Sequence, residues 1–562
     1  MFLPITKKEV EKLGWDYLDI ILVSGDAYID HPCFGIAVIG RTLENAGYRV
    51  AIIAQPNWKD DLRDFKKFGT PRLFFGVTSG AMDSMVNHYT AMKRLRSDDA
   101  YTPNNVAGFR PDYATSLYSN ILKQLYPNVP IVLGGIEASM RRVAHYDYWA
   151  DKLFPSILIS SKADILVYGM GEKIILSIAE AFSKKKSLKE ISSLPQIAFL
   201  TNKIEEEKEN IILPSFEECL KNKKQQALSI RLVEENANSF NSKTIYQKYE
   251  EGYIRINPFD YSFSSEDLDK TFSLPYQRKP HPKYEKRGKI PAFEMIKHSV
   301  NIHRGCFGGC SFCTIAAHQG KKVVSRSEKS ILEEVETISK DKDFKGYLSD
   351  IGGPSANMYK MQGKNLDICQ RCNRPSCIHP SICKNLNHDH SPILSLYRKI
   401  RSLPYIKKAF IGSGIRYDIF TDMEYFNEVF LYHTSGRLKV APEHTSKKVL
   451  SLMRKPSFDK FIEIKKNFDL LNKKYVKKQQ LIPYFISSFP SCKEEDMKEL
   501  SQITKKMGYK LEQVQDFTPT PMTIATEIYY TGYDPYTMEK IYCAKTIEEK
   551  KKQNLAFFWW KK

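Results

Sequence analysis

Short runs of apolar residues alternate with amphipathic segments in the first part of the chain. Residues 19–24 and 48–53 are apolar enough to be buried strands, and residues 34–46 between them carry apolar side chains at helical spacing. Gly47 follows the expected helix, as glycines often do at helix ends. This order predicts a βαβ unit with parallel strands.

The same alternation continues to about residue 185. Further strands are expected at 72–77, 129–133 and 164–168, each followed by a turn that contains glycine, and a helix is expected at 173–182. Strands that alternate with helices favour a doubly wound parallel sheet. We therefore predict an α/β fold class, with an N-terminal open α/β domain over residues 1–185.

The alternation of expected strands and helices weakens after this domain and resumes from about residue 300. Residues 186–290 are rich in lysine, glutamate and asparagine, and we expect a connector there. The string Ser325-Arg-Ser-Glu328 has the pattern of a capping box and predicts the start of a helix. Strands separated by helical segments are predicted at residues 300–303, 344–350, 406–411, 437–441, 481–487 and 511–517. We therefore predict a (β/α) barrel over 291–520 and a C-terminal extension over 521–562.

Three cysteines in the barrel region are the strongest chemical signal of the chain. Cys306, Cys310 and Cys313 lie on a short loop that contains glycine. Iron–sulfur clusters normally have four cysteine ligands, so three thiolates can hold a 4Fe–4S cube and leave one iron open. Zinc sites usually show two short cysteine pairs separated by a longer stretch, which this triplet lacks. Phe312 is placed to cover a flat ring beside the cluster.

The CxxxC-x-aromatic-C spacing resembles the signature of the radical S-adenosylmethionine (SAM) superfamily. The resemblance implies a partial (β/α) barrel in which the open iron chelates SAM, and one electron cleaves SAM to a 5′-deoxyadenosyl radical. It also implies a glycine pair that meets the SAM amino group, and Gly352 and Gly353 match that pair. Pro354 stands where an acidic residue is common, so Asp350 or the backbone alone is expected to make this contact.

Polar side chains follow two later predicted strands. Arg416 comes after one strand, and Glu443 and His444 come after the next. Barrels of this kind place their chemistry at the carboxyl ends of the strands. We therefore predict that Arg416 and Glu443 contact the bound cofactor, with helix capping or surface ion pairs as the alternative for each residue.

A second group of cysteines lies in an insertion over residues 364–390. The group consists of Cys369, Cys372, Cys377 and Cys383, with histidines nearby. Four cysteines so close together predict a possible second metal site, either a structural zinc site or an auxiliary iron–sulfur cluster. The chain has no secretory signal pattern, so disulfides are not expected.

Longer strings resemble one family, the YgiQ-like, largely uncharacterised radical SAM proteins. They are Ser24-Gly-Asp-Ala-Tyr-Ile-Asp-His-Pro32, Gly134-Gly-Ile-Glu-Ala-Ser139, His298-Ser-Val-Asn-Ile-His-Arg-Gly-Cys306, Asp350-Ile-Gly-Gly-Pro-Ser-Ala-Asn-Met358 and Val440-Ala-Pro-Glu-His444. The resemblance implies a 4Fe–4S cluster and SAM, but no substrate. Related enzymes often bind cobalamin in a comparable N-terminal domain, through a histidine in Asp-x-His-x-x-Gly. Asp30-His-Pro-Cys-Phe-Gly35 has a different spacing, so we expect no tight cobalamin binding.

The predicted function is reductive cleavage of SAM and abstraction of hydrogen from an unknown substrate. This chemistry needs a low-potential electron donor such as flavodoxin or ferredoxin. The alternatives are an RNA-modifying methylthiotransferase or methylase, and a non-catalytic iron–sulfur redox sensor. The sequence alone assigns no catalytic side chain.

Charge and hydropathy restrict the kinds of partner that we expect for this chain. The net charge is +20, but the basic residues are scattered among acidic ones, so a nucleic-acid substrate is a candidate that we do not favour. No stretch of about 18 apolar residues occurs, so no membrane span is expected. A cytoplasmic location is the resulting expectation.

Overall fold

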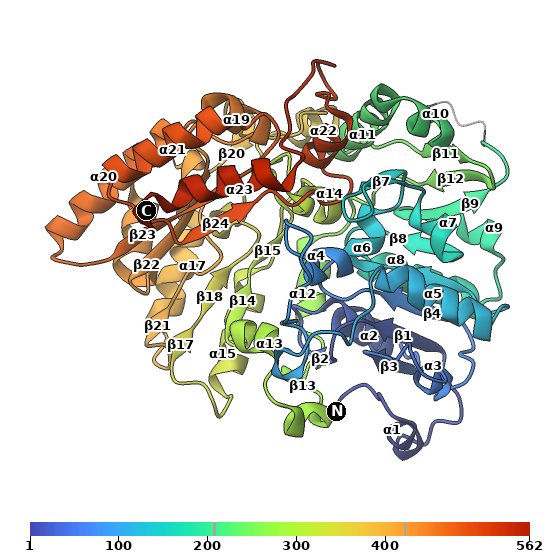
Figure 1. Cartoon of the computed structure of the whole chain (residues 1–562). Coiled ribbons are helices and arrows are strands. Elements are labelled where there is room, and N and C mark those ends of the chain that lie inside the picture. The colour runs from blue at the N-terminus through green and yellow to red at the C-terminus, as the bar shows by residue number, and fades with distance from the viewer. Residues whose placement is uncertain (206–208, 421–422, 562) are drawn as a thin grey trace. The chain divides into compact units, whose positions relative to one another are not determined.

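The computed structural model describes residues 1–205, 209–420 and 423–561, and the chain divides into two units. The first unit comprises residues 1–237 and 241–297, and the second comprises 238–240 and 298–562. Each unit is described by itself below, with the helices and strands labelled as in Figure 1.

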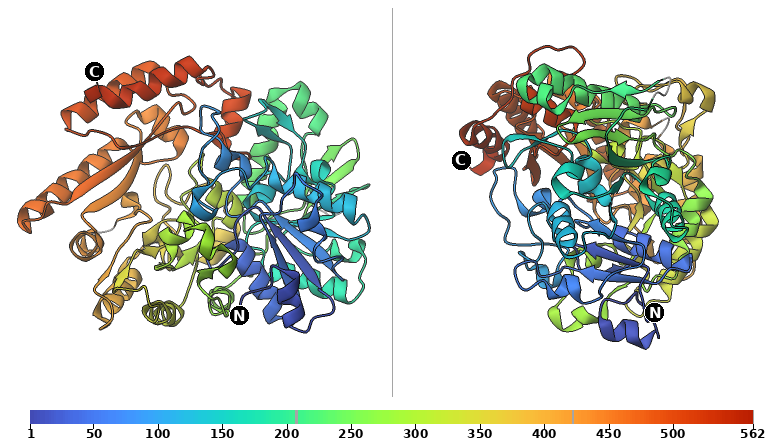
Figure 2. Two further views of the ribbon diagram at one scale, coloured as in Figure 1. Left: turned by 60° about the horizontal axis from the view of Figure 1, so that its bottom comes forward. Right: turned by 90° about the vertical axis from the view of Figure 1, so that its right-hand side faces the viewer.

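A nine-stranded sheet organises the first unit, in the order β10-β11-β12-β9-β8-β5-β4-β1-β3. Its parallel strands are almost entirely apolar and buried, as expected for a sheet that is covered on both faces (Figure 2). Helices α2 (Gly35–Asn45) and α8 (Glu172–Ser183) pack together, as do α5 (Ala114–Leu125) and α7 (Ile157–Ser161). The parallel strands are β1 (Ile20–Ser24), β3 (Val50–Ala54), β4 (Phe74–Thr78), β5 (Ile131–Leu133) and β8 (Ile165–Val167). The predicted α/β fold class is confirmed.

Residues 186–290 belong to the first unit and extend its sheet, so they do not form the connector that their composition suggested. The added strands are β9 (Ile197–Thr201), β10 (Ile211–Ile212), β11 (Ile245–Tyr249) and β12 (Gly252–Ile256). Strands β11 and β12 were not predicted from the sequence because each contains a buried polar residue. Gln247 accepts a hydrogen bond from the Ala144 amide at 2.8 Å, and Arg255 Nε donates to Asn257 Oδ1 at 2.8 Å. Such satisfied polar groups can be buried without a large cost.

An ion-pair network joins the loops that follow β1 and β4. Arg110 Nη2 lies 2.7 Å from Asp26 Oδ1 and 3.4 Å from Asp99 Oδ2, and Arg110 Nη1 donates to the Ser79 carbonyl at 2.8 Å. Asp26 also accepts from the Ala81 amide at 2.6 Å. After β1 the chain crosses to β3, and after β4 it continues to β5 on the other side. Ligands often bind where the strand order reverses in this way, but Arg110 and Asp26 occupy the position here.

The second unit contains parallel strand pairs with helices between them along the chain (Figure 1). The pairs are β14 (Ser299–Asn301) with β18 (Asp350–Gly352), β17 (Tyr347–Leu348) with β21 (Lys408–Ala409), and β22 (Arg437–Glu443) with β23 (Gln480–Ser487) and β24 (Gln513–Asp516). The intervening helices include α15 (Glu328–Ser339), α17 (Ser391–Ser402), α18 (Glu424–Glu428), α20 (Phe458–Lys474) and α21 (Glu494–Lys506). These parallel pairs lie within residues 291–520 in separate sheets of two or three strands, and several strands are shorter than predicted.

One predicted helix start needs correction. Helix α15 begins at Glu328, and Ser327 is its N-cap residue because its Oγ accepts from the Ser330 amide at 3.1 Å. Ser325, the first residue of the predicted capping box, instead accepts from the Lys360 amide at 2.8 Å. Ser327 caps the helix instead, because Ser325 already lies in strand β16 (Val324–Ser325).

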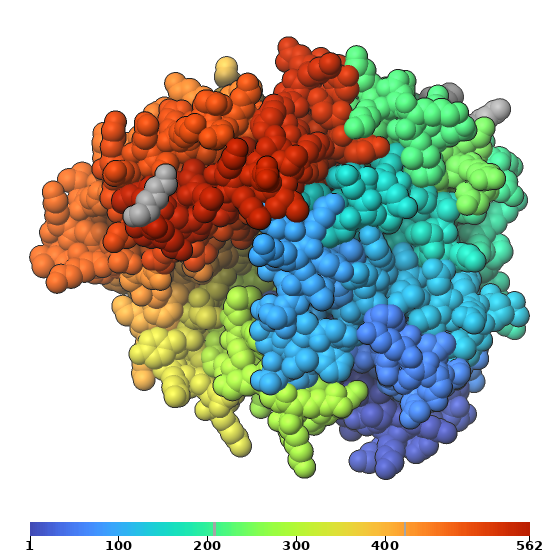
Figure 3. All heavy atoms as spheres, viewed as in Figure 1, coloured from blue at the N-terminus to red at the C-terminus, as the bar shows by residue number. Residues whose placement is uncertain are grey.

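The C-terminal extension packs on the end of the second unit. Helix α22 (Ile524–Thr531) is followed by α23 (Ile547–Leu555) and the 3₁₀ segment Ala556–Lys561. Helix α23 contacts α21, β23 and β24, and the 3₁₀ segment contacts α21, which places the red C-terminal residues over the orange ones in Figure 3. Phe557 in the 3₁₀ segment is fully buried. Among the residues that the structure describes, no helix combines the length and apolar character that crossing a membrane requires.

His444 fixes the end of strand β22. Its Nδ1 accepts from the Ser446 amide at 3.0 Å, and its Nε2 lies 3.4 Å from the Cys492 sulfur. Burial lowers the pKa of His444 to about 4, so the ring is neutral at pH 7. Its position is therefore explained by structure, as a pair with a cysteine that follows β23.

We predict that Arg110→Met loosens the first unit. The change leaves Asp26 and Asp99 buried without their cation, which costs about 3–5 kcal/mol. Hydrogen–deuterium exchange of β1 and β4 should accelerate strongly. Arg63→Met is the control, because the pair of Arg63 with Asp61 is exposed and should leave exchange unchanged. Unchanged protection of β1 and β4 in Arg110→Met would contradict the assignment.

We also predict that His444 makes the second unit sensitive to acid. In the unfolded chain His444 takes a proton near its ordinary pKa of about 6.5. In the folded chain it does so only near pH 4, so stability falls as the pH drops from 6.5 toward 4. The share of His444 is up to about 3 kcal/mol. Denaturant unfolding of His444→Asn should show a shallower pH dependence than the parent chain; equal slopes would exclude this role.

Candidate active site of the second unit

The cysteine loop, residues 305–313, connects β15 (His303–Arg304) to α14 (Thr314–Gln319). Gly305 and Gly309 have φ angles of 83° and 61°, which favour glycine. A Cβ atom on Gly305 would lie 2.0 Å from the Lys322 carbonyl oxygen, and one on Gly309 would lie 2.0 Å from the Pro375 carbonyl oxygen. Both glycines are therefore required by close backbone neighbours.

The loop is also held from the side of α19 (Lys447–Met453) and α22. Ser311 Oγ donates to the Leu452 carbonyl at 2.7 Å, and Arg454 Nη1 donates to the Gly309 carbonyl at 3.2 Å. The Ala525 amide donates to the Ser311 carbonyl at 2.9 Å. These bonds use polar groups of the loop other than its thiols, so the loop is braced without consuming its sulfur ligands.

The three thiols of the loop lie within electrostatic reach of one another. The Gly308 amide donates to Cys306 Sγ at 3.4 Å, and Arg416 Nη1 donates to Cys310 Sγ at 3.4 Å. Burial raises the pKa of Cys306, and it raises the pKa of Cys313 to about 12, with the other two cysteines as further causes. Hydrogen-bond donors and a nearby cation favour the thiolate form, which a metal cluster requires. The chemistry of these donors therefore suits an iron–sulfur cluster, although the side chains of the described residues are not gathered into a group that could hold a metal ion.

Arg416 is anchored before it reaches the sulfur. Its guanidinium forms two bonds with Asp418, at 3.0 and 2.5 Å. Its backbone exchanges two hydrogen bonds with the Asn357 side chain, at 2.8 and 2.9 Å. Asn357 also lies 3.2 Å from His390 Nε2. Arg416 is thus directed at Cys310, and its contact with a bound cofactor stays a prediction.

Glu443 lies near Arg416, although the two residues are distant in sequence. It has a φ angle of 67° where the register between β22 and β23 shifts, and its Oε1 lies 3.6 Å from Lys455 Nζ. Burial raises the pKa of Glu443, while the charges of Lys455 and Arg416 oppose that shift. The carboxyl group of Glu443 is therefore paired with Lys455 and feels the charge of Arg416.

The glycine pair lies at the end of β18, beside β14. The Gly352 carbonyl accepts from the Ile302 amide at 2.8 Å. A Cβ on Gly352 would lie 2.0 Å from Ser413 Oγ, and one on Gly353 would lie 2.6 Å from His303 Nε2. Asp350 Oδ1 accepts from the Gly412 and Ser413 amides, at 2.8 and 3.2 Å. Asp350 therefore braces the next loop, which leaves Gly353 as the better candidate for a ligand contact.

Phe312 is fixed edge-on against a second aromatic ring. Its centroid lies 6.0 Å from that of Phe489 at an interplanar angle of 82°, and Phe489 in turn lies 5.2 Å from Phe517. Edge-to-face contacts of this kind hold ring orientations. The position next to Cys313 suits the predicted role of Phe312 as a cover for a flat ring.

The second cysteine group lies against the first loop. The Cys377 amide donates to the Phe307 carbonyl at 3.0 Å, and all four cysteines of the group are free thiols. His390 is held by Asn357, so it belongs to the brace of Arg416. Within residues 1–205, 209–420 and 423–561, no group of three or more His, Cys, Asp and Glu side chains is arranged so that it could hold a metal ion.

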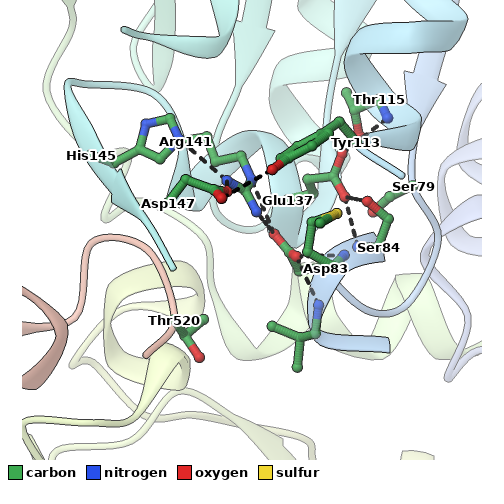
Figure 4. Close-up of polar contacts among 12 residues, drawn as sticks. Ser79, Asp83, Ser84, Tyr113, Thr115, Glu137, Arg141, His145, Asp147 and Thr520 are labelled. Carbon is green, nitrogen blue, oxygen red and sulfur yellow. Dashed lines mark hydrogen bonds and ion pairs between the residues drawn. The ribbon is translucent and has the colours of Figure 1, made fainter. Parts of the chain in front are cut away.

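The first unit contains a buried polar network that sequence reasoning missed (Figure 4). Arg141 lies between Asp83 and Asp147, at 2.9 and 3.2 Å. Glu137 accepts from the amide and hydroxyl of Ser84, at 2.7 and 2.6 Å. The acidic residue after the glycine pair in Gly134-Gly-Ile-Glu137 was the available signal. These acceptors are filled by the protein, so the network reads as structural.

His31 is also engaged within the first unit. The ring is fully buried, its Nδ1 accepts from the Cys33 amide at 3.2 Å, and its Nε2 lies 3.0 Å from Arg278 Nη2. Burial, followed by the charge of Arg278, lowers the pKa of His31 well below its ordinary value. A ring held on both sides would need rearrangement before it could bind cobalt.

Comparison with known proteins supports the resemblance. The family model described as "Radical SAM N-terminal" matches residues 2–299, and one described as "Domain of unknown function (DUF3362)" matches residues 512–562. A UPF0313 protein of Bacteroides thetaiotaomicron is 56% identical over 100% of this chain and 94% of its own length. UPF0313 proteins of Porphyromonas gingivalis and Clostridium botulinum are 56% and 47% identical, and the matches cover 90% and 86% of their lengths.

Solved structures show the same fold at low sequence identity. The radical SAM methyltransferase TsrM from Kitasatospora setae, with cobalamin and a [4Fe-4S] cluster bound, is 14% identical with a TM-score of 0.51. That match covers 90% of this chain and 77% of TsrM. TsrM with tryptophan and a SAM analogue bound gives a TM-score of 0.50, with 90% and 75% coverage. With the sequence matches, these findings show that the chain belongs to the UPF0313 family of radical SAM proteins.

Proposed function

We propose that this chain is a radical SAM enzyme whose cluster ligands are Cys306, Cys310 and Cys313. The observation that carries the proposal is the braced loop, which presents three thiols and no fourth. A 4Fe–4S cluster with one open iron, together with SAM, supplies one-electron chemistry: reductive cleavage of SAM and abstraction of hydrogen from a substrate. The substrate class stays open, and a low-potential donor such as flavodoxin or ferredoxin is the expected electron source.

The side chains around the loop have separate tasks in this proposal. Arg416 donates an N–H to the Cys310 sulfur and offsets the negative charge of the thiolates. Glu443 and the Gly353 backbone are the groups that orient SAM, and Phe312 covers its flat ring. Because Arg416 is buried and paired with Asp418, it reaches the sulfur in one fixed orientation.

Methyl transfer is the second candidate reaction. The observation that favours it is the fold match to a methyltransferase whose structure contains cobalamin and a [4Fe-4S] cluster. The engaged ring of His31 and the ion pairs at Arg110 argue against a cobalamin site built as in that fold. Hydrogen abstraction therefore stays the first proposal.

We predict that the triplet alone carries the SAM-responsive cluster. Anaerobically reconstituted protein should show a 4Fe–4S spectrum that shifts when SAM is added, and reductant should release methionine. The triple variant Cys306→Ala, Cys310→Ala and Cys313→Ala should lose the shift and lower methionine release at least 100-fold, or about 3 kcal/mol of barrier. Cys219→Ala changes a buried cysteine of the first unit and is the matched control. A SAM-induced shift that survives the triple change sinks the proposal.

We further predict no tight cobalamin binding. Anaerobic protein mixed with hydroxocobalamin should leave gel filtration without the visible bands of the cofactor, because His31 is buried and held by Cys33 and Arg278. Tryptophan fluorescence during the same titration checks weak binding. Stoichiometric retention of cobalamin would overturn the prediction and favour methyl transfer.

A further inference from the structure

The cysteine-rich insertion, residues 364–390, is packed on the loop that carries the cysteine triplet. The Cys377 amide donates to the Phe307 carbonyl of that loop at 3.0 Å. Phe307 also belongs to one apolar cluster with Leu386, which lies in strand β20 (Leu386–Asn387) of the insertion. The insertion is therefore anchored next to the proposed cluster ligands, by a backbone hydrogen bond and by apolar packing.

A short helix of the insertion, α16 (Leu366–Gln370), is held beside β20 by the Asn385 side chain. Asn385 Oδ1 accepts from the Asn365 amide at 2.9 Å, and its Nδ2 donates to the Asn365 carbonyl at 2.8 Å and to Cys369 Sγ at 3.3 Å. Strand β19 (Gln362–Gly363), which precedes the helix, pairs antiparallel with β20. Both ends of α16 are thus tied to the part of the insertion that packs on the triplet loop.

Although α16 is held in place, it faces solvent. None of its residues is buried, and Leu366 and Ile368 are 50% and 55% exposed. Single exposed apolar residues are common on protein surfaces, but two on one fixed turn provide an apolar centre that a partner can cover. Since the turn is already ordered by Asn385, a partner would not have to order it on binding.

Basic side chains surround this apolar pair. Residues 364–384 contain four basic side chains and one acidic side chain. Lys364, Arg371 and Lys384 are exposed, and none of the three takes part in an ion pair with any residue that the structure describes. The Lys364 amide donates to the Asn385 carbonyl at 2.7 Å, so Lys364 and Lys384 lie on adjacent segments. The α16 patch is the set Lys364, Leu366, Ile368, Arg371 and Lys384.

We propose that the α16 patch is the docking surface of the electron donor, and that this donor is a flavodoxin, a small acidic protein with a bound flavin. The inference rests on the proposed function, because a cluster on the triplet loop is what requires a donor. The acidic surface of the partner matches the basic rim of the patch, and the apolar edge of a flavin matches Leu366 and Ile368. In the docked pair the anionic reduced flavin loses one electron and no proton, the cluster gains that electron, and no bond is made or broken.

The anchoring of the insertion explains why a donor would dock here. Electron transfer slows steeply with distance, so the flavin must come close to the triplet loop. Helix α16 is tied through Asn385 to the segment that contains Leu386, and Leu386 packs in the same cluster as Phe307. A partner on the α16 patch is therefore bound to a segment that itself contacts the triplet loop.

Docking can be measured without the cluster. The full chain with all three triplet cysteines changed to Ala should bind oxidised flavodoxin in isothermal titration calorimetry. Adding Lys364→Glu, Arg371→Glu and Lys384→Glu should weaken that binding about tenfold or more at about 50 mM salt. Raising the salt to about 500 mM should weaken binding by the unreversed chain and narrow the difference, because salt screens exposed charges.

The matched control reverses three exposed lysines elsewhere in the second unit. Lys473→Glu, Lys474→Glu and Lys478→Glu change the net charge equally but lie just before β23, at the amino end of that strand. This control should leave the affinity for flavodoxin within about twofold, because it leaves the α16 patch intact. Leu366→Ser with Ile368→Ser should weaken binding at both salt concentrations, because it removes the apolar centre.

The reconstituted parent chain gives a second measurement. Reduced flavodoxin should bleach the visible absorption of the cluster, and the reversal of the three patch charges should slow bleaching about tenfold or more while reduction by dithionite stays unchanged. Equal affinities and equal bleaching rates in the parent and the reversed chain overturn the docking surface. So does a reversal that abolishes retention of tRNA, or that weakens binding of a ferredoxin, while flavodoxin binding is unchanged. A parent chain that assembles no cluster overturns the proposed function instead, and since the calorimetry needs no cluster, the two failures are distinguishable.

Discussion

A single constraint shapes the second unit: a loop of nine residues must keep three sulfurs for a ligand while its backbone is packed closely by the protein. Gly305 and Gly309 meet this constraint, since each has a neighbouring carbonyl where a side chain would stand. The neighbours come from residue 322 on one side and from the insertion on the other. The α19 end and α22 complete the brace through Ser311. A loop backbone so fixed loses little conformational entropy when a ligand binds to it.

Placing three cysteines on one short loop also concentrates negative charge when their thiols are ionised. Burial raises the pKa values of Cys306 and Cys313, and the charges of neighbouring thiolates raise them further. Arg416 offsets the negative charge of the thiolates, and several residues hold Arg416 in place. Asp418 fixes its guanidinium and Asn357 fixes its backbone, while His390 orders Asn357. The site therefore extends well beyond the cysteines, into the ends of the neighbouring strands.

The sequence predicted local features well and distant contacts poorly. The strands around β1 and β3 were evident because their apolar residues are buried on both faces, and the cysteine triplet was evident because its spacing lies within one loop. Strands β11 and β12 were missed because Gln247 and Arg255 are buried yet satisfied. The bond between Arg416 and Cys310 spans 106 positions, and no local pattern indicates such a pair. The shift of the α15 cap from Ser325 to Ser327 shows the same limit, since pairing of β16 decided it.

The first unit shows why a shared fold does not settle a cofactor. Its sheet reverses strand order between β1 and β4, the position where such sheets commonly bind ligands. Here Arg110, Asp26 and Asp99 fill that position with ion pairs, and Arg141 with Asp83 and Asp147 repeats the arrangement nearby. A buried charge that loses its partner is costly, so a ligand entering this edge would have to replace each pair with equal hydrogen bonds. The residues at the edge, rather than the order of the strands, therefore determine what this unit can bind.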